Sequence, residues 1–301
     1  MTTFGEAIAR AERRLGGAGV AEPRRDARLL LADLLECDVA TIIAWPERSL
    51  STEAEAAFEQ RVDRRLRREP VSRILERREF WSLPFVVSHD TLDPRPDSEA
   101  LVAALLDQIG ERQQPLRVLD LGTGTGCLLL ALLSELPNAT GLGIDCSAGA
   151  VATARENAFR LGLDGRAEIR LGNWTEGVEE AFDVLICNPP YIPDSEIAGL
   201  EPEVAHWEPR AALVGGEDGL DPYRLIIPQL AHLLRPTGIA GFEHGLGQAK
   251  AIEALVGQEQ RWRSGRVKDL AGHDRALIIF SEGAMKKKQL ESPVRLARFD
   301  S

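Results

Sequence analysis

The chain has 301 residues, of which 44% are hydrophobic and 28% are charged. This composition provides enough apolar surface for a buried core and excludes an intrinsically disordered chain. The net charge of -11 argues against a large nonspecific nucleic-acid footprint, because phosphate contacts need clustered lysine and arginine. The length predicts one ordinary α/β domain together with a smaller one.

Membrane insertion and metal binding are not expected either. No apolar run approaches the roughly 20 residues that cross a bilayer, and residues 1–10 contain Glu6 and no apolar signal-peptide block. A cytoplasmic location is therefore predicted. The wide spacing of the cysteines fits neither a zinc site nor a disulfide framework, so we expect reduced, metal-free thiols at Cys37, Cys127, Cys146 and Cys187.

The first 78 residues carry apolar side chains at helical spacing, as at Leu30 and Leu34, and are predicted to form a small helical bundle. Eight arginines gather toward its end, at positions 61, 64, 65, 67, 68, 73, 77 and 78. Two interpretations of this cluster remain open. It is either a solvated helix face paired to Asp63 and Glu69, or a docking surface for a partner.

Between residues 79 and 92, two extended pieces at 80–81 and 85–87 are separated by Pro84, which predicts a β-hairpin linker. Residues 93–283 alternate between helical and strand patterns, and this alternation predicts an α/β fold with a doubly wound, mostly parallel sheet. The expected strands cover 117–121, 141–144, 167–171, 182–187, 239–242 and 276–280. Residues 284–301 lose this periodicity and are predicted to form a flexible tail.

The first strand of this alternation runs directly into a glycine-rich turn, Gly122-Thr123-Gly124-Thr125-Gly126. Glycine lets the backbone approach a ligand, and ligands of such sheets settle at the carboxyl ends of the strands. A dinucleotide site needs its third glycine at the position of Cys127, so the spacing argues against NAD and favours a ligand without a pyrophosphate. A purely structural turn remains the alternative.

Two carboxylates and a tryptophan flank this turn. Asp120 precedes it by two residues, where it could meet the ammonium of a methionine moiety, and Asp145 ends the next strand, where an acidic residue can accept both ribose hydroxyls. Trp174 is placed to pack against an adenine. Together these residues favour S-adenosylmethionine over a phosphate-bearing cofactor. Capping or turn carboxylates and a core tryptophan are the alternatives.

The strand at 182–187 is followed by the most informative loop of the chain, Asn188-Pro189-Pro190-Tyr191. The prolines stiffen it and leave the Asn188 side-chain carbonyl and the Pro189 backbone carbonyl as acceptors. Two acceptors suit an NH2 group, whose delocalised lone pair attacks poorly unless its hydrogens are held and the lone pair points at the methyl group. Tyr191 offers a flat wall for a planar group. A structural Pro-Pro turn is the alternative.

Taken together, these motifs resemble those of the class I methyltransferases, and among them the family of bacterial enzymes that methylate a glutamine in peptide-chain release factors. The resemblance extends over nearly the whole chain, to about Phe280. It rests first on the two loops, Asp120-Leu-Gly-Thr-Gly-Thr-Gly126 and Asn188-Pro-Pro-Tyr191. Shorter matches are Pro94-Arg95-Pro96, Glu208-Pro-Arg-Ala-Ala-Leu213, Asp218-Gly-Leu220 and Tyr223-Arg224. The chain departs from the family pattern at Asp93, Asp97-Ser98-Glu99, Asn173 and Glu243-His244-Gly245.

The resemblance implies a seven-stranded, Rossmann-like sheet, S-adenosylmethionine as the cofactor and the glutamine of the release factors' Gly-Gly-Gln motif as the substrate. The cofactor would contact Gly122 to Gly126, Asp145, Trp174 and Asn188. Asn188 to Tyr191 would hold the glutamine, with Arg95 as a further substrate contact, and Asn188, Pro189 and Tyr191 would carry the chemistry. No metal and no direct nucleic-acid partner are expected.

Three other functions remain open at this point: methylation of a ribosomal-protein glutamine, methylation of a nucleic-acid amino group, and a noncatalytic binding role. Pro96 after Arg95 favours the release-factor type by analogy. The acidic charge disfavours nucleic acid, and the intact loop at 188–191 argues against a noncatalytic module. Because one glutamine side chain offers few atoms for recognition, we expect residues 1–78 to recognise the protein substrate.

Overall fold

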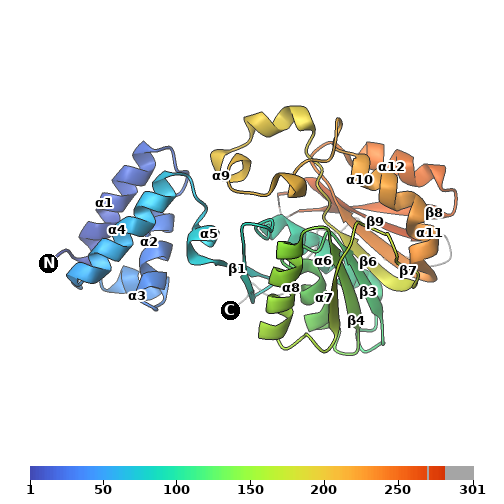
Figure 1. Ribbon diagram of the computed structural model, residues 1–301, viewed down its shortest axis with the longest axis horizontal. Coiled ribbons are helices and arrows are strands. Elements are labelled where there is room, and N and C mark those ends of the chain that lie inside the picture. Colours follow the sequence, from blue (N-terminus) through green and yellow to red (C-terminus); the bar gives the residue numbers. More distant parts are fainter. Residues whose placement is uncertain (270, 282–301) are drawn as a thin grey trace. The chain divides into compact units, whose positions relative to one another are not determined.

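The computed structural model describes residues 1–269 and 271–281 (Figure 1). Its internal contacts separate the chain into two units. The first, which we call the helical unit, consists of Met1–Arg77 and Glu201–Trp207. The second, the sheet unit, comprises Arg78–Leu200 and the described residues from Glu208 onward. The tail predicted at 284–301 lies outside the described residues.

The helical unit is built from short helices, five of which contribute apolar side chains to one core. These helices are α1 (Phe4–Gly17), α2 (Pro23–Leu34), α3 (Val39–Ala44), α4 (Thr52–Leu66), α5 (Val71–Leu75) and α9 (Pro202–Ala205). α1 begins with a capping box, in which the Thr3 hydroxyl accepts from the Glu6 backbone N–H and the Glu6 carboxylate accepts from that of Thr3. Leu15, Leu31 and Phe58 are buried where α1, α2 and α4 meet.

Most of the arginine cluster is used inside the helical unit. Five of its eight members form ion pairs there, namely Arg61, Arg64, Arg65, Arg68 and Arg77. Of the two carboxylates expected as partners, Glu69 pairs with Arg64 at 2.6 Å, whereas Asp63 pairs with Arg14 of α1. The cluster therefore joins helices of this unit, and it offers less free charge to a partner than its density in the sequence suggests.

A short segment from far along the chain completes the helical unit. Glu203 on α9 accepts hydrogen bonds from Arg65 at 2.8 Å and from Nε and Nη2 of Arg68 at 2.7 and 2.6 Å. Arg65 is buried and also donates to Asp26 on α2 at 2.8 Å. Although burial opposes ionisation, the hydrogen bonds from the two arginines lower the pKa of Glu203 to about 2. We call these four residues the Glu203 clamp.

The predicted β-hairpin is present, but its turn comes earlier than expected. β1 (Arg77–Phe80) pairs with β2 (Leu83–Val86) across the two-residue turn Trp81-Ser82. Both turn residues have left-handed backbone angles, with φ of 54° and 56°, which glycine or asparagine usually supplies. Pro84, expected to separate the strands, lies inside β2, because each strand of a two-stranded ribbon has a free edge that tolerates proline.

The sheet unit contains seven strands in the order β5-β4-β3-β6-β7-β9-β8. All pairs from β5 to β7 are parallel, and β9 runs antiparallel to both β7 and β8. The strands are β3 (Arg117–Leu121), β4 (Thr140–Asp145), β5 (Ala167–Leu171), β6 (Phe182–Cys187), β7 (Leu234–Glu243), β8 (Trp262–Lys268) and β9 (Asp274–Ser281). This arrangement confirms the predicted doubly wound, mostly parallel fold.

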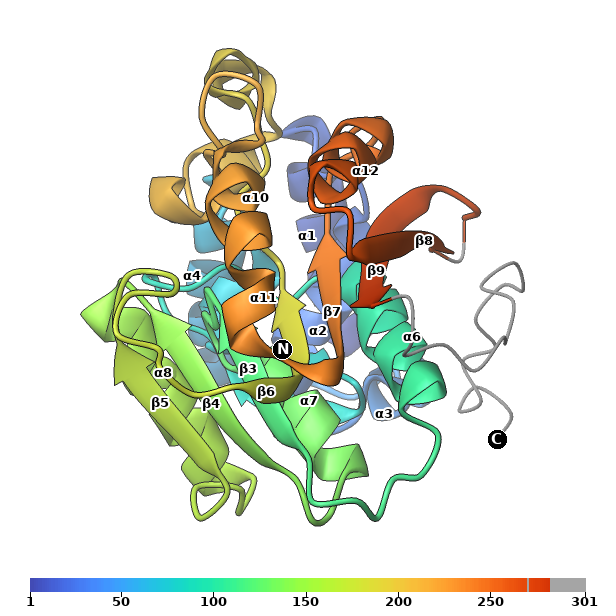
Figure 2. The same cartoon turned by 90° about the vertical axis from the view of Figure 1, so that its right-hand side faces the viewer.

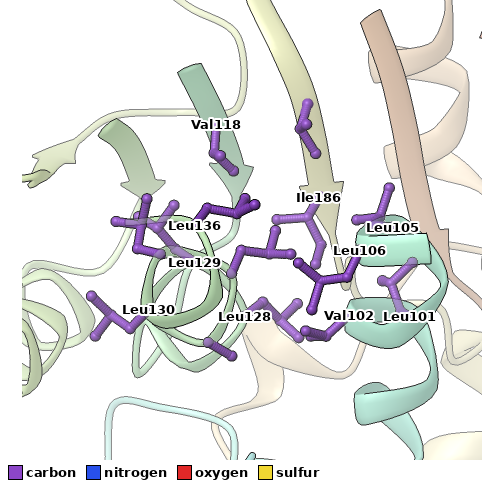
Figure 3. Packing of buried hydrophobic residues seen from close by; sticks show 14 of the residues in the cluster. Leu101, Val102, Leu105, Leu106, Val118, Leu128, Leu129, Leu130, Leu136 and Ile186 are labelled. Atoms are coloured by element: carbon purple, nitrogen blue, oxygen red, sulfur yellow. The ribbon is translucent and has the colours of Figure 1, made fainter. Parts of the chain in front are cut away.

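Helices cover both faces of the sheet (Figure 2). One face packs against α6 (Glu99–Ile109), α7 (Cys127–Glu135) and α8 (Ala148–Arg160), and the other against α10 (Asp221–Ile226), α11 (Leu230–Leu233) and α12 (Ala249–Gln258). Val118 and Ile186 point toward α6 and α7 (Figure 3), whereas their neighbours Leu119 and Leu185 belong to the opposite core. Burial on both faces explains why these strands read as continuous apolar runs.

Short connections complete the sheet unit. They include four 3-10 helices, η1 (Pro96–Ser98), η2 (Asp194–Gly199), η3 (Arg210–Ala212) and η4 (Ile227–Gln229). Asn157 on α8 is fully buried and bonds to both backbone groups of Val86, at 2.8 and 3.0 Å, and to the Thr125 carbonyl at 2.9 Å. One side chain thereby ties the hairpin to the glycine turn.

Among the described residues, every helix is too short or too polar to span a membrane. The longest of these helices, α4, has 15 residues and carries acidic side chains in its first turn and basic ones in its last.

Candidate active site

The residues singled out in the sequence converge on one edge of the sheet. β3 lies between β4 and β6, and Leu121 near its end pairs with Ile144 on one side and Cys187 on the other. Because the three strands are parallel, the loops that follow them leave the sheet at the same edge. The glycine turn, Asp145 and Asn188 therefore occupy neighbouring positions.

Asp120 is fully buried, and only one of its two carboxylate oxygens is hydrogen-bonded. Oδ2 accepts from the Thr123 hydroxyl at 2.6 Å, while Oδ1 has no hydrogen-bond partner among the described residues. Burial raises the pKa of Asp120 to about 7. A buried acceptor without a donor costs free energy, and a cationic ligand beside the glycine turn would supply the missing donor.

The glycine turn needs its glycines and fixes Asp145. Gly122, Gly124 and Gly126 have φ of 72°, 55° and 80°, in the left-handed region that side chains rarely tolerate. The Gly124 N–H donates to Asp145 Oδ2 at 2.8 Å, and the Ser147 N–H donates to Oδ1 at 2.9 Å. The Asp145 carboxylate is thus held in one orientation, with lone pairs left over for a pair of hydroxyls.

Trp174 lies over the glycine turn. A Cβ atom at Gly122 would be 3.5 Å from the indole ring of Trp174. The same side chain is half-buried and packs against the core on the α10–α12 face. Trp174 therefore packs against the core and also lies beside the glycine turn. Asn173, where the family pattern has an aspartate, donates to Glu176 at 2.8 Å.

Asn188 is half-buried at the end of β6, and the Pro189 that follows it is buried. The Asn188 Nδ2 group donates to the Ser98 hydroxyl at 3.4 Å. Its side-chain oxygen accepts no hydrogen bond from any residue that the structure describes. The loop thus keeps a side-chain acceptor available at the edge of the sheet.

The loop at 188–191 is held in place from outside. Gln248 donates to the Tyr191 carbonyl at 2.9 Å, and its own side-chain oxygen accepts from the Gly245 N–H at 2.9 Å. Gly219 comes so close that a Cβ atom there would lie 2.2 Å from the Tyr191 carbonyl oxygen. Gln248 carries no motif signal in the sequence and was not predicted, whereas Gly219 stands in one of the short family matches.

The Tyr191 ring remains a neutral phenol at physiological pH. Burial raises its pKa, and the nearby carboxyl group of Glu243 raises it further, against smaller opposing effects of Arg275 and Arg95. An uncharged, mostly buried ring suits a wall for a planar group, and it is a poor proton acceptor at neutral pH.

Arg95 stands beside the loop in an ion pair. Its guanidinium donates to Glu208 at 3.2 Å, and the other oxygen of the buried Glu208 carboxylate accepts from the Asp93 N–H at 3.2 Å. Glu208 therefore holds the Pro94-Arg95-Pro96 segment in place. The contact joins two of the short family matches that lie far apart in the sequence. Arg95 is still partly exposed, so its guanidinium can also reach a ligand.

Cys127 and Cys187 lie near the site but are not expected to act as nucleophiles. Burial raises the pKa of Cys127 to about 12 and that of Cys187 well above its usual range. Cys187 donates through its thiol to the Leu121 carbonyl at 3.1 Å. Because the thiolate is the reactive form, both side chains act as small core residues. All four cysteines of the chain are free.

The strand order, with its glycine turn after β3, defines a class I methyltransferase. One family model, described as PrmC N-terminal domain, matches residues 6–75, and another, described as Methyltransferase small domain, matches residues 77–200. A release factor glutamine methyltransferase of Rhodospirillum rubrum is 46% identical over 278 residues, which cover 91% of this chain and 84% of that protein. The chain belongs to the release factor glutamine methyltransferase family.

One further relative agrees with this assignment, and one solved structure agrees with the fold. A release factor glutamine methyltransferase of Caulobacter vibrioides is 43% identical over 292 residues, which cover 97% of this chain and 99% of that protein. Among solved structures, the hMettl16 catalytic domain in complex with a 3′UTR hairpin has a TM-score of 0.56 at 15% identity, over 82% of this chain and 86% of that one. At that identity the likeness concerns the fold alone.

Proposed function

We propose that this protein transfers a methyl group from S-adenosylmethionine to the side-chain amide nitrogen of the Gly-Gly-Gln glutamine in peptide-chain release factors. The observation that carries the proposal is the loop at 188–191, which holds an available side-chain acceptor, Asn188 Oδ1, beside the glycine turn. Peptide release takes place on cytoplasmic ribosomes, so the same proposal puts the reaction in the cytoplasm. Nucleic acid is not expected as a substrate.

The residues around the glycine turn fit this cofactor. The unpartnered Oδ1 of Asp120 would accept from the ammonium of the methionine moiety, and Asp145 would accept from both ribose hydroxyls. Trp174 would lie beside the adenine, and the glycines at 122–126 let the backbone come close. The chemistry that the cofactor supplies when bound is an electrophilic methyl group on a sulfonium sulfur.

The loop at 188–191 would activate the glutamine amide nitrogen, which is a weak nucleophile. Asn188 Oδ1 and the Pro189 carbonyl would each accept one N–H of the glutamine amide. This grip turns the nitrogen lone pair toward the methyl group and stabilises the positive charge that develops on nitrogen. Tyr191 would support the plane of the amide, and Gln248 and Gly219 would keep the loop in place.

Incubation with methyl-labelled S-adenosylmethionine and a purified release factor tests the proposal. We expect one methyl group per factor, located by peptide mass on the glutamine of the Gly-Gly-Gln motif. A factor in which that glutamine is replaced by glutamate should take up no label. Label on a ribosomal-protein glutamine or on RNA, with none on the factor, would replace this proposal with one of the alternatives from the sequence.

Asp145 is expected to dominate recognition of the ribose. Removal of a carboxylate that accepts two hydroxyls should cost about 1.5–3 kcal/mol, so Asp145→Ala should weaken cofactor binding roughly 10- to 100-fold. Isothermal titration calorimetry measures this change directly. Asp164→Ala, which removes an exposed carboxylate, is the matched control. Unchanged affinity in a folded Asp145→Ala variant would remove the residue from the cofactor site.

We further propose that the helical unit recognises the release factor. A single glutamine cannot distinguish one protein from another, and the helical unit lies outside the catalytic fold. With most of the arginine cluster paired internally, the best contact candidates are two large apolar side chains at the end of α3, Ile43 at 52% and Trp45 at 51% exposure. Exposed tryptophan is typical of binding hot spots.

The double substitution Ile43→Ser with Trp45→Ala is expected to lower kcat/KM for the intact factor about 30-fold, because truncation of a binding hot spot costs about 2 kcal/mol. Cofactor affinity and the rate on a short Gly-Gly-Gln peptide should stay the same, because neither needs the helical unit. Phe159→Ala, which removes an exposed ring of the sheet unit, is the control. Equal losses on factor and peptide would show that these side chains support folding and not recognition.

A further inference from the structure

We propose that Ser98 and Glu243 form a hydrogen-bond relay that fixes the orientation of the Asn188 side-chain amide, and that both are positioning residues for methyl transfer. The inference rests on the proposed role of Asn188 as the acceptor that grips the substrate amide. Neither Ser98 nor Glu243 is among the site residues that the sequence motifs indicated.

The position of Ser98 points to a role in the site. Ser98 joins η1 to α6 with helical backbone angles, φ of -67° and ψ of -18°, and its side chain makes no capping bond to α6. Its hydroxyl is buried and accepts instead from Asn188 Nδ2 at 3.4 Å. The hydroxyl is therefore used for a contact with the loop at 188–191 and not for capping the helix.

Glu243 also lies near this hydroxyl. It ends β7, whose preceding residue Phe242 pairs with Cys187, so Glu243 and Asn188 leave the sheet side by side. Glu243 is buried, and its backbone carbonyl accepts from the Tyr223 hydroxyl at 2.7 Å, which anchors the strand end. The Ser98 hydroxyl lies close enough to the Glu243 carboxyl group to favour its ionisation, and we infer that it donates to this carboxyl group.

The direction of the relay follows from which groups can donate. An ionised carboxylate only accepts hydrogen bonds, so the single hydroxyl hydrogen of Ser98 goes to Glu243. Ser98 can then only accept from Asn188, which directs Nδ2 toward Ser98 and leaves Oδ1 on the opposite side of the amide. A flipped amide would place Oδ1 against the lone pairs of Ser98. The relay thus selects the one orientation that offers an acceptor to a substrate NH2 group.

The electrostatic setting supports an ionised Glu243 under alkaline conditions. Burial raises its pKa to about 7, while the Ser98 hydrogen bond and the positive charges of Arg275 and Arg95 favour ionisation and the charge of Asp97 opposes it. The second carboxyl oxygen, Oε2, has no hydrogen-bond partner within the described part of the chain. Assays at pH 8 keep the carboxylate ionised and the relay in a single state.

The first test removes the hydroxyl. Ser98→Ala is expected to lower kcat about tenfold, the scale for loss of one preorganised polar contact acting through a neighbour, and to leave the Kd for S-adenosylmethionine unchanged. Ser98→Thr restores the hydroxyl and should recover most of the rate. Ser134→Ala, which removes an exposed hydroxyl bonded only to a carbonyl of its own helix, should have no effect.

A double-mutant cycle separates positioning from general support of the fold. If Ser98 acts through Asn188, then Ser98→Ala should cost nothing more, within about twofold, in an Asn188→Ala background. Glu243→Gln should lower kcat in the wild-type background and likewise lose its effect in Ser98→Ala. Losses that multiply in these backgrounds, or full activity of Ser98→Ala, would overturn the relay.

These experiments also distinguish a failure of the relay from a failure of the proposed function. If the wild-type protein places no methyl group on the factor's glutamine, the proposed function fails. If the wild type does so and Ser98→Ala is as fast, only the relay fails.

Discussion

Replacement of Asn188 by alanine is expected to lower the rate of methyl transfer by about 100-fold or more, the effect of deleting a preorganised group that stabilises developing charge. The substrate amide would keep only the Pro189 carbonyl as an acceptor, and its lone pair would no longer be aimed at the methyl group. Single-turnover kinetics with the intact release factor measure the loss directly, without a contribution from product release.

The control for this substitution is cofactor binding. Calorimetry should give a Kd for S-adenosylmethionine within a few-fold of wild type, because Asp120 and Asp145 remain. Asn138→Ala removes an exposed asparagine that bonds only to the Gln113 carbonyl and should be silent in both assays. A turnover rate near wild type in the Asn188→Ala variant would remove this residue from the mechanism.

The second large effect concerns pH and cofactor affinity. With the pKa of Asp120 raised to about 7 by burial, the carboxyl is mostly protonated at pH 5 and ionised at pH 8. Only the ionised form attracts the ammonium of the methionine moiety, so affinity should rise about tenfold per pH unit up to pH 7 and then level off. Calorimetry in buffers of different ionisation enthalpy should show a proton released on binding below pH 7.

Two comparisons isolate Asp120 as the titrating group. Asp120→Asn should bind weakly with little pH dependence, since an amide neither ionises nor attracts the ammonium. 5′-Methylthioadenosine, which lacks the amino-acid moiety, should bind wild type equally well at pH 5 and pH 8. A steep pH dependence for that ligand, or for the Asn variant, would mean that another group titrates.

The same shift has a consequence for the cofactor-free protein. A carboxyl whose pKa rises from 3.8 to about 7 on folding stabilises the fold when protonated, and it loses that contribution as the pH rises toward 7. The contribution falls by about 1.4 kcal/mol per pH unit between the two values. Bound S-adenosylmethionine should reduce this slope, because its ammonium stabilises the ionised form.

The sequence predicted the strands in which buried apolar residues predominate. β3 and β6 begin and end where predicted, and Asp120 and Asp183 are the only polar residues inside them. β5 also matches its predicted bounds, although it is an edge strand whose apolar positions alternate with Glu168 and Arg170. β8 escaped notice, since it is an edge strand in which only Trp262 and Val267 are buried and Gly265 interrupts the pattern. The hairpin turn was misplaced because Trp81 and Ser82 adopt a conformation that their side chains disfavour.

The two loops of the candidate active site could be predicted from the sequence for a different reason. The glycine turn and the loop at 188–191 consist of residue types that few other structural roles require together. The groups that support them are ordinary residues, such as Gln248 and Ser98, which gain their roles only through contacts across 57 and 90 positions. No local pattern encodes such distances, so these residues become visible only in the folded chain.

The Glu203 clamp makes the helical unit discontinuous in sequence, and this affects how the protein can be dissected. A fragment that ends at Arg77 would lack residues 201–207 and leave the buried guanidinium of Arg65 with one of its two carboxylate partners. A chain that starts after Arg77 would keep residues 201–207 but lack the helices of the unit to which they belong. Neither half is a faithful sample of the intact protein, so substrate recognition is better dissected by point substitution than by a single cut.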